Sequence, residues 1–248
     1  MVVYGRNAVR EALRGRRRVE RVWASASAAR EPWLADAPLL VVDQDEIEAR
    51  AGSGEHQGVC AEAGPYPYAD ADDLLAPEDA LVICLDQVQD PHNLGAVCRV
   101  AEVAGAAGVV IPDRRAAEVT PAACKASAGA VEHLPVARVR NVTDFLAAAK
   151  EAGAWVYGTA AEGATPYHRP DYRGRVVLVL GSEGRGLRPR VAAACDDLVA
   201  LPVRGRVGSL NVSAAAAALV YGVLELRRRA ADGGTPGGRD VAGRPAAT

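Results

Sequence analysis

Three segments of the 248-residue chain place polar side chains and glycines where an apolar run ends and a helical pattern begins. Amides, hydroxyls, carboxylates and guanidinium groups at such junctions can orient a substrate, hold a proton or stabilise developing charge. In open α/β sheets, ligands bind at the carboxyl ends of the strands, so these segments are candidate binding loops. They span residues 86–95, 180–186 and 205–213, and their candidate functional side chains are Asn93, Glu183, Ser209 and Asn211, with Arg99 shortly after the first segment.

Each of these segments also has a purely structural explanation. Asn93 is a good N-cap for the helix that follows it, and Ser209 or Asn211 is a good N-cap for the last helix. Arg99 and Glu102 have the spacing of an ion pair on an exposed helix face. The glycines of the second segment suit a tight turn. Spacing alone favours these structural explanations and does not define a reaction.

Several kinds of site are disfavoured by the motifs. The second segment reads G-x-x-G-x-G rather than the dinucleotide-binding G-x-G-x-x-G, and no Gly-Lys-Ser/Thr forms a P-loop. The four histidines have no serine-elbow partner, and no metal-ligand spacing occurs. The odd number of cysteines, without a C-x-x-C pair, predicts buried reduced thiols at Cys60, Cys84, Cys98, Cys124 and Cys195.

The elements that must position these side chains alternate between strand and helix from Ala80 onward. Near-continuous apolar runs such as VVLVL are typical of strands covered on both faces, so we predict an α/β domain with a mostly parallel sheet. Predicted strands span 80–85, 108–111, 134–139, 154–157, 176–180 and 198–201. Predicted helices span 93–105, part of 121–130, 143–152, 188–194 and 211–229.

Residues 1–63 form a smaller predicted α/β unit. Its expected strands span 19–24, 39–42 and 58–63, and its helices span 7–13 and 43–51, the latter capped by Asp43. A proline-rich, acidic linker is expected over 64–79, the main domain over 80–229, and a disordered Gly- and Pro-rich tail over 230–248.

Composition describes a water-soluble protein with an uneven charge distribution. Half of the residues are hydrophobic, and the formal net charge is only −2, which argues against a strongly basic nucleic-acid binder. However, residues 1–30 carry a net +6 and residues 31–90 a net −14, which suggests separate roles. Because the sequence has neither a signal-peptide pattern nor a long apolar segment, we expect a cytoplasmic protein without a membrane span.

The three segments, in this order, resemble the three motifs of the SpoU/TrmH family of RNA ribose 2′-O-methyltransferases. The matching stretches are DQVQDPHNLGAVCRVAEVAGAAGVVIP (86–112), VLVLGSEGRGL (177–187) and LPVRGRVGSLNVSAAAAA (201–218). VYGRNAVREAL and HQGVCAEA resemble the two ends of a small RNA-binding domain in the subfamily that methylates a 23S rRNA guanosine. Two departures are a shortened stretch around 24–38 and Gly208, where the family more often has an acidic residue.

This resemblance implies a trefoil-knotted α/β domain that works as a homodimer and binds S-adenosylmethionine in the knot. General topology rules would not have predicted a knot. The residues matching the family's cofactor contacts are Gly181, Leu201 and Leu210, which act through their main chains. No metal is required for this transfer.

The resemblance also assigns roles to the polar side chains. Arg99 is expected at the ribose hydroxyl, where it orients the substrate and stabilises charge, since a guanidinium group is a poor base. Glu183 is expected to position Asn93 by hydrogen bonding, while Ser209 and Asn211 orient the ribose and the cofactor loop. Together with Arg99, these four residues form the expected catalytic set.

The basic N-terminus is expected to bind rRNA phosphates through Arg6, Arg16, Arg17 and Arg18, although a solvated arginine-rich surface would look the same. The alternatives are another rRNA or tRNA target, a non-catalytic RNA-binding factor, and a dinucleotide-dependent oxidoreductase. The missing dinucleotide fingerprint disfavours the last of these.

Overall fold

The computed structural model describes residues 1–160 and 164–232, which build two sheets. The first is a four-stranded sheet in the order β1-β4-β2-β3, in which only the β2–β3 pair is parallel. Its elements are β1 (Val2–Tyr4), α1 (Arg6–Arg14), β2 (Val19–Ala24), η1 (Ala28–Arg30), η2 (Pro32–Leu34), β3 (Leu39–Val41), α2 (Gln44–Ala51), η3 (Gly54–His56) and β4 (Val59–Ala63).

Local sequence explains most of this small domain. Asp43 caps α2 as predicted, because side chains of this type accept hydrogen bonds from the first turn of a helix. Its carboxylate accepts a hydrogen bond from the Glu46 backbone N–H at 2.8 Å. Strand β1 was not predicted from the sequence. It is defined by its antiparallel pairing with β4, which lies almost sixty residues away along the chain.

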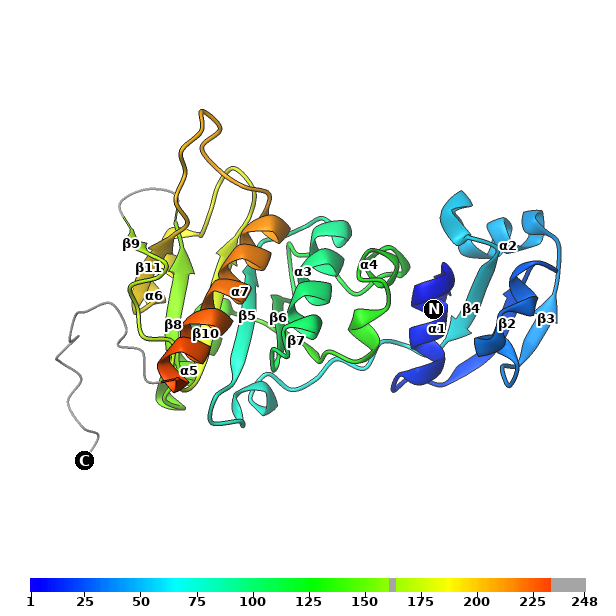
Figure 1. The fold of residues 1–248 in the computed structure, drawn as a ribbon, viewed down its shortest axis with the longest axis horizontal. Helices are drawn as coiled ribbons and strands as arrows, with labels where there is room; N and C mark the ends of the chain where they lie inside the picture. Colours follow the sequence, from blue (N-terminus) through cyan, green and yellow to red (C-terminus); the bar gives the residue numbers. More distant parts are fainter. Residues whose placement is uncertain (161–163, 233–248) are drawn as a thin grey trace.

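The second sheet has seven strands in the order β7-β6-β5-β10-β8-β11-β9, and all of its neighbouring strands are parallel. Figure 1 shows helices on its faces. Its strands are β5 (Leu81–Asp86), β6 (Gly108–Pro112), β7 (Val136–Val139), β8 (Trp155–Thr159), β9 (Thr165–Pro166), β10 (Val176–Gly181) and β11 (Asp197–Ala200). Its helices are α3 (Pro91–Val103), α4 (Pro121–Ala126), η5 (Ala130–Glu132), α5 (Val142–Glu151), α6 (Pro189–Ala194) and α7 (Val212–Ala231).

Alternating side chains of the central strands fill two separate cores. Leu85 and Leu180 pack in the core that contains residues of α3 and α7, whereas Cys84 and Val179 pack with α5 and α6. This alternation explains why β5 and β10 are apolar along almost their whole length and are buried on both faces. The predicted α/β class with a mostly parallel sheet is confirmed.

Two segments near the predicted domain boundaries can be compared with the described elements. Helix α7 continues through Ala231, so the tail predicted from 230 onward begins inside a helix, and residues 233–248 lie outside the described residues. The predicted linker, 64–79, contains the short turn η4 (Asp73–Leu75) and packs against the large domain. The Tyr66 hydroxyl donates to the carbonyls of Val131 and Leu134, and the Ala69 N–H donates to the Val136 carbonyl.

The small domain lies against the β7 end of the large sheet, with α1 beside α4 (Figure 1). Gly5, before α1, lies against Lys125 in α4, and Gly15, after α1, lies against Glu132 in η5. The chain runs through α4 and η5 from the end of β6 to the start of β7, that is, from the carboxyl edge of the sheet to its amino edge. The start of α1 therefore lies toward the carboxyl edge, and its end lies toward the amino edge.

Candidate active site

The first two predicted segments meet because β5 and β10 are neighbours whose last residues, Asp86 and Gly181, are in register. The Asp86 carboxylate is fully buried and accepts hydrogen bonds from the Arg188 backbone N–H at 2.9 Å and from its Nε at 2.8 Å. A buried carboxylate of this kind is stable only when it is paired and hydrogen-bonded. Asp86 and Arg188 therefore hold the loop after β10 against the end of β5.

A polar cluster joins all three predicted segments at this edge. The Asn93 Nδ2 atom donates to Glu183 Oε1 at 2.9 Å, so the hydrogen bond expected between these two residues is present. Asn211 Nδ2 lies 3.0 Å from Asn93 Oδ1 and 2.5 Å from Glu183 Oε1. One carboxylate therefore orients two amides that are far apart in the sequence.

Helix capping explains part of this arrangement. Asp90, rather than Asn93, caps α3 by accepting from the His92 N–H at 2.8 Å, which leaves the Asn93 amide available to Glu183. Asn211 caps a helix and takes part in the cluster. Its Oδ1 accepts from the Ser213 N–H at 2.8 Å as the N-cap of α7, while its Nδ2 donates to Glu183. Asn93 is therefore not the N-cap of its helix. Asn211 is an N-cap and also belongs to the polar cluster.

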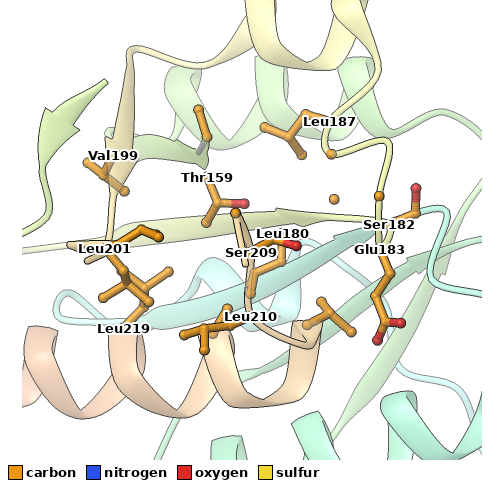
Figure 2. Close-up of a pocket in the computed structure, with 18 of the residues that line it drawn as sticks. Thr159, Leu180, Ser182, Glu183, Leu187, Val199, Leu201, Ser209, Leu210 and Leu219 are labelled. Atoms are coloured by element: carbon orange, nitrogen blue, oxygen red, sulfur yellow. The ribbon is translucent and has the colours of Figure 1, made fainter. Parts of the chain in front are cut away.

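Next to the cluster is a pocket of about 740 Å³, lined by the ends of β8, β10 and β11, the loops after β10 and β11, and the start of α7. The three expected cofactor contacts, Gly181, Leu201 and Leu210, line it, and so do Ser209 and Glu183. In Figure 2, Leu201, Leu210 and Leu219 lie toward one side of the pocket, and Glu183 lies on the other. The pocket thus has an apolar wall on one side, and the polar cluster borders the pocket through Glu183.

Gly181 sits where the chain turns tightly after β10. A Cβ atom there would lie 2.1 Å from the Gly186 carbonyl carbon and 2.4 Å from the Leu187 nitrogen, both backbone atoms. Gly184 and Gly186 have positive φ angles of 75° and 65°. This region of backbone conformation favours glycine. The Gly186 N–H donates to the Ser182 carbonyl at 2.9 Å, so the glycines build a compact loop whose main chain forms part of the pocket wall.

Arg99 does not join this cluster within one chain. It follows Asn93 by six residues on α3, which places it about 9 Å along the helix and about 120° around its axis. Its side chain is exposed, does not line the pocket, and has no hydrogen bond or ion pair with any described residue, including Glu102. The sequence-predicted catalytic set is thus only partly brought together.

The four predicted RNA-binding arginines have different environments. Arg6 is exposed near the start of α1 and pairs with Glu31 at 3.0 Å, and Arg16 and Arg18 are exposed after the end of α1. Arg17 instead lies inside the domain interface, where its side chain is 2% exposed and pairs with the 1% exposed Glu132. Because its guanidinium is buried, Arg17 cannot contact RNA phosphates at the surface, and its assignment is corrected to a structural one.

Comparison with known proteins identifies the family. The model of the SpoU rRNA methylase family matches residues 80–221, and a model described as RNA 2′-O ribose methyltransferase substrate binding matches residues 2–69. The chain belongs to the SpoU rRNA methylase family. The predicted RNA methyltransferase class is thereby confirmed, and the small domain corresponds to the family's substrate-binding domain.

Curated relatives and solved structures agree with this assignment. YacO of Bacillus subtilis, described as a TrmH family tRNA/rRNA methyltransferase, is 39% identical over 91% of this chain and 95% of its own length. A tRNA/rRNA methyltransferase of Synechocystis is 38% identical over 91% of this chain, which spans 62% of that relative.

Among solved structures, the SpoU methyltransferase AviRb from Streptomyces viridochromogenes, in complex with AdoMet, has a TM-score of 0.78 and 25% identity. The match covers 95% of this chain and 91% of AviRb. An AdoMet-bound rRNA methyltransferase from Sinorhizobium meliloti also has a TM-score of 0.78, with 26% identity over 90% of this chain and 86% of its own.

Several residues that shape this SpoU site were not singled out from the sequence. Asp86 and Arg188 form the buried tie between the first two motifs, and Thr159, Val199 and Leu219 line the pocket. Only the polar character of Asp86, at the end of an otherwise apolar run, signalled its importance.

Two further features concern what the described residues lack. No cluster of three or more histidine, cysteine or acidic side chains suited to a metal ion occurs among them. Likewise, no helix within 1–160 or 164–232 has both the length and the apolar character needed to cross a bilayer.

Proposed function

We propose that this protein transfers a methyl group from S-adenosylmethionine to a ribose 2′-hydroxyl of RNA, with a guanosine of 23S rRNA as the target. The observation that carries this proposal is the pocket beside the Asn93–Glu183–Asn211 cluster; the cluster takes one residue from each of the three family motifs. The relatives named as tRNA/rRNA methyltransferases and the AdoMet complex of AviRb support it.

The pocket suits a nucleoside cofactor in size and chemistry. Its volume is about 740 Å³. Small-molecule sites usually have volumes of about 300 to about 1000 Å³, so the pocket lies within that range. Leu201, Leu210 and Leu219 provide apolar contacts for an adenine ring, and the turn at Gly181 allows the main chain to approach closely. Gly181, Leu201 and Leu210 are the proposed cofactor-binding residues.

When bound, S-adenosylmethionine supplies a methyl group activated by its sulfonium, so the residues need only align the ribose and assist loss of its proton. Glu183 holds the amides of Asn93 and Asn211 in fixed orientations through the two hydrogen bonds to its Oε1. In this role Glu183 is a positioning residue, while Asn93, Asn211 and Ser209 face the ribose and the cofactor loop.

Arg99 is proposed to stabilise charge at the ribose from the outer face of α3. In this role Arg99 orients the substrate and does not act as the base. Because Arg99 lies around the helix from Asn93, this role requires RNA, a second copy of the chain, or both, to bridge that face and the pocket.

A homodimer provides such an assembly. Val103 on α3 is 65% exposed and Tyr221 on α7 is 49% exposed, and these two helices pack against each other. We propose that a second copy covers these apolar side chains. The trefoil knot implied by the family stays a prediction, as do the domain limits 1–63 and 80–229 and a cytoplasmic location.

The decisive experiment combines cofactor binding with mapping of the product. Calorimetry should detect S-adenosylmethionine binding, and methylation mapping of total RNA from cells with and without the gene should reveal one 2′-O-methylated site. A site in tRNA, or elsewhere in rRNA, would retain the reaction and change the target. Bound cofactor with no transfer to any RNA would refute the proposed activity.

A further inference from the structure

We propose that Arg114, Arg115 and Arg140 form an additional contact surface for the RNA backbone, between the small domain and the cofactor pocket. This inference rests on the proposed function, because RNA is the ligand in both. It adds a phosphate-binding path that lies outside the small domain and outside the three family motifs.

The three arginines lie at the same edge of the sheet as the polar cluster. β6 and β7 are parallel to β5, and their last residues, Pro112 and Val139, are in register. Arg114 and Arg115 follow β6, and Arg140 follows β7. Since the carboxyl ends of parallel strands meet at one edge, these side chains emerge at the edge that carries Asn93 and Glu183.

The sheet order places this group between the two parts that must contact RNA. The pocket lies on the β10-β8-β11 side of β5, whereas β6 and β7 lie on the other side. The small domain packs beyond β7, against α4 and η5, as Figure 1 shows. An RNA strand that reaches from the small domain to the pocket along this edge passes over the ends of β7 and β6.

The loop that carries Arg114 and Arg115 is held firmly in place. The Asp113 N–H donates to the Val139 carbonyl at 2.8 Å, and the Ala117 N–H donates to the Val88 carbonyl, also at 2.8 Å. The second bond ties this loop to the segment that precedes Asn93. Arg115 has a positive φ angle of 58°. This conformation is uncommon for a residue with a side chain, and such conformations cluster at functional sites.

The three arginines have no ion-pair partner among the described residues at this edge. Arg138 pairs with Asp113 at 3.3 Å and with Glu118 at 3.5 Å, so both carboxylates of this loop already have an arginine partner other than Arg114, Arg115 and Arg140. Another carboxylate, Asp144, is exposed in the first turn of α5. Within the described part of the chain, no hydrogen bond or ion pair is formed by the exposed side chains of Arg114, Arg115 and Arg140. Unpaired arginines of this kind are suited to phosphate groups.

The arginines that follow α1 are located differently. Arg16 donates to the carbonyl of His133, which precedes β7, so it lies near the amino edge of the large sheet. Arg18 is a near neighbour in the chain. The exposed arginines predicted from the sequence to bind RNA, other than Arg6, therefore lie toward the opposite edge from the cofactor pocket.

This contrast provides a matched experiment. The variants R114A/R115A and R16A/R18A each remove two exposed positive charges, so they change the net charge equally. RNA affinity is measured for both at several salt concentrations, together with S-adenosylmethionine affinity and methyl-transfer kinetics on the substrate RNA of the wild-type protein. R114K/R115K, which keeps the charge, serves as the rescue variant.

We expect R114A/R115A to weaken RNA binding about tenfold or more and to lower the slope of log K against log salt by about 1.4 to 1.8. KM for RNA should rise while kcat and cofactor affinity stay unchanged, and R114K/R115K should recover most of the loss. R16A/R18A should change RNA affinity less than R114A/R115A does.

Equal RNA affinity and an equal salt slope in R114A/R115A and wild type would overturn the inference. So would a larger loss in R16A/R18A than in R114A/R115A. If the wild-type protein binds the cofactor but methylates no RNA, the proposed function itself fails, which is a different result from an active wild type with an unaffected variant.

Discussion

Replacing Arg17 by alanine should destabilise the protein strongly, although the sequence places this residue in an arginine run that resembles an exposed surface. Its Nε donates to Glu132 Oε2 at 3.0 Å, a second guanidinium nitrogen pairs with Glu132 Oε1, and Nη1 donates to the Gly64 carbonyl at 3.1 Å. The guanidinium also lies 5.7 Å from the centre of the Tyr66 ring. These contacts join α1, the linker and η5.

The expected loss of stability follows from the buried carboxylate that remains after the substitution. Both side chains of the pair are at most 2% exposed, so R17A leaves the Glu132 carboxylate buried without its cationic partner. Removing one partner of a buried pair costs about 3–5 kcal/mol, compared with about 1 kcal/mol for an average substitution. Burial lowers the pKa of Arg17, but its hydrogen bond with Glu132 and the charge of Glu132 raise that pKa above the ordinary value, so the Arg17 guanidinium keeps its charge in the folded protein.

Thermal and urea unfolding of R17A, R16A and R18A measures this cost directly. For a chain of this length, a loss of about 3–5 kcal/mol corresponds to a Tm decrease of about 6–20 °C. R16A and R18A should change the free energy of unfolding by less than about 0.5 kcal/mol, because both side chains are exposed. R17M/E132L, which removes both charges, should regain much of the lost stability. A loss in R17A as small as that in R16A would refute the assignment of a buried interdomain pair.

Three other predictions concern the pocket and the thiols. E183Q should lower methyl transfer about tenfold to hundredfold with a smaller change in cofactor affinity, because it weakens the charge-assisted hydrogen bonds from Asn93 and Asn211; unchanged kinetics would exclude a positioning role. G181A should abolish cofactor binding in calorimetry, because its Cβ would overlap the backbone at Gly186, whereas G64A, where an added Cβ would lie 3.9 Å from the nearest atom, should bind normally. Burial raises the pKa of Cys60 and Cys124 to about 11 and of Cys195 to about 12, and it raises the pKa of Cys84 and Cys98 as well. Iodoacetamide at a pH of about 8 should therefore label none of them in the native protein and all five in urea; rapid native labelling would contradict this burial.

Local patterns predicted most of the elements because period and capping act over a few residues. β2 has the predicted bounds Val19–Ala24, and α2 begins after its predicted cap, Asp43. β1 and β9, with three and two residues, are too short for any period to appear, and long-range pairing defines them. The buried thiols were also predicted correctly for four of the five cysteines, while Cys195 is partly exposed.

The site was predictable only where several motifs were considered together. Spacing alone favoured Asn93 as a helix cap, whereas the family resemblance paired it with Glu183, ninety residues away, as the structure does. The burial of Arg17 could not be predicted in the same way. Its partner lies 115 residues along the chain, and nothing in the local sequence distinguishes Arg17 from its exposed neighbours Arg16 and Arg18.

The burial of Arg17 also bears on how RNA reaches the pocket. With Arg17, Tyr66 and the flanks of α1 packed against the large domain, the small domain has one orientation relative to the sheet. That orientation directs the start of α1, with Arg6, toward the carboxyl edge and leaves Arg16 near the amino edge. A net charge of −2 is therefore compatible with RNA binding, because the charges that matter are those at one edge of one sheet.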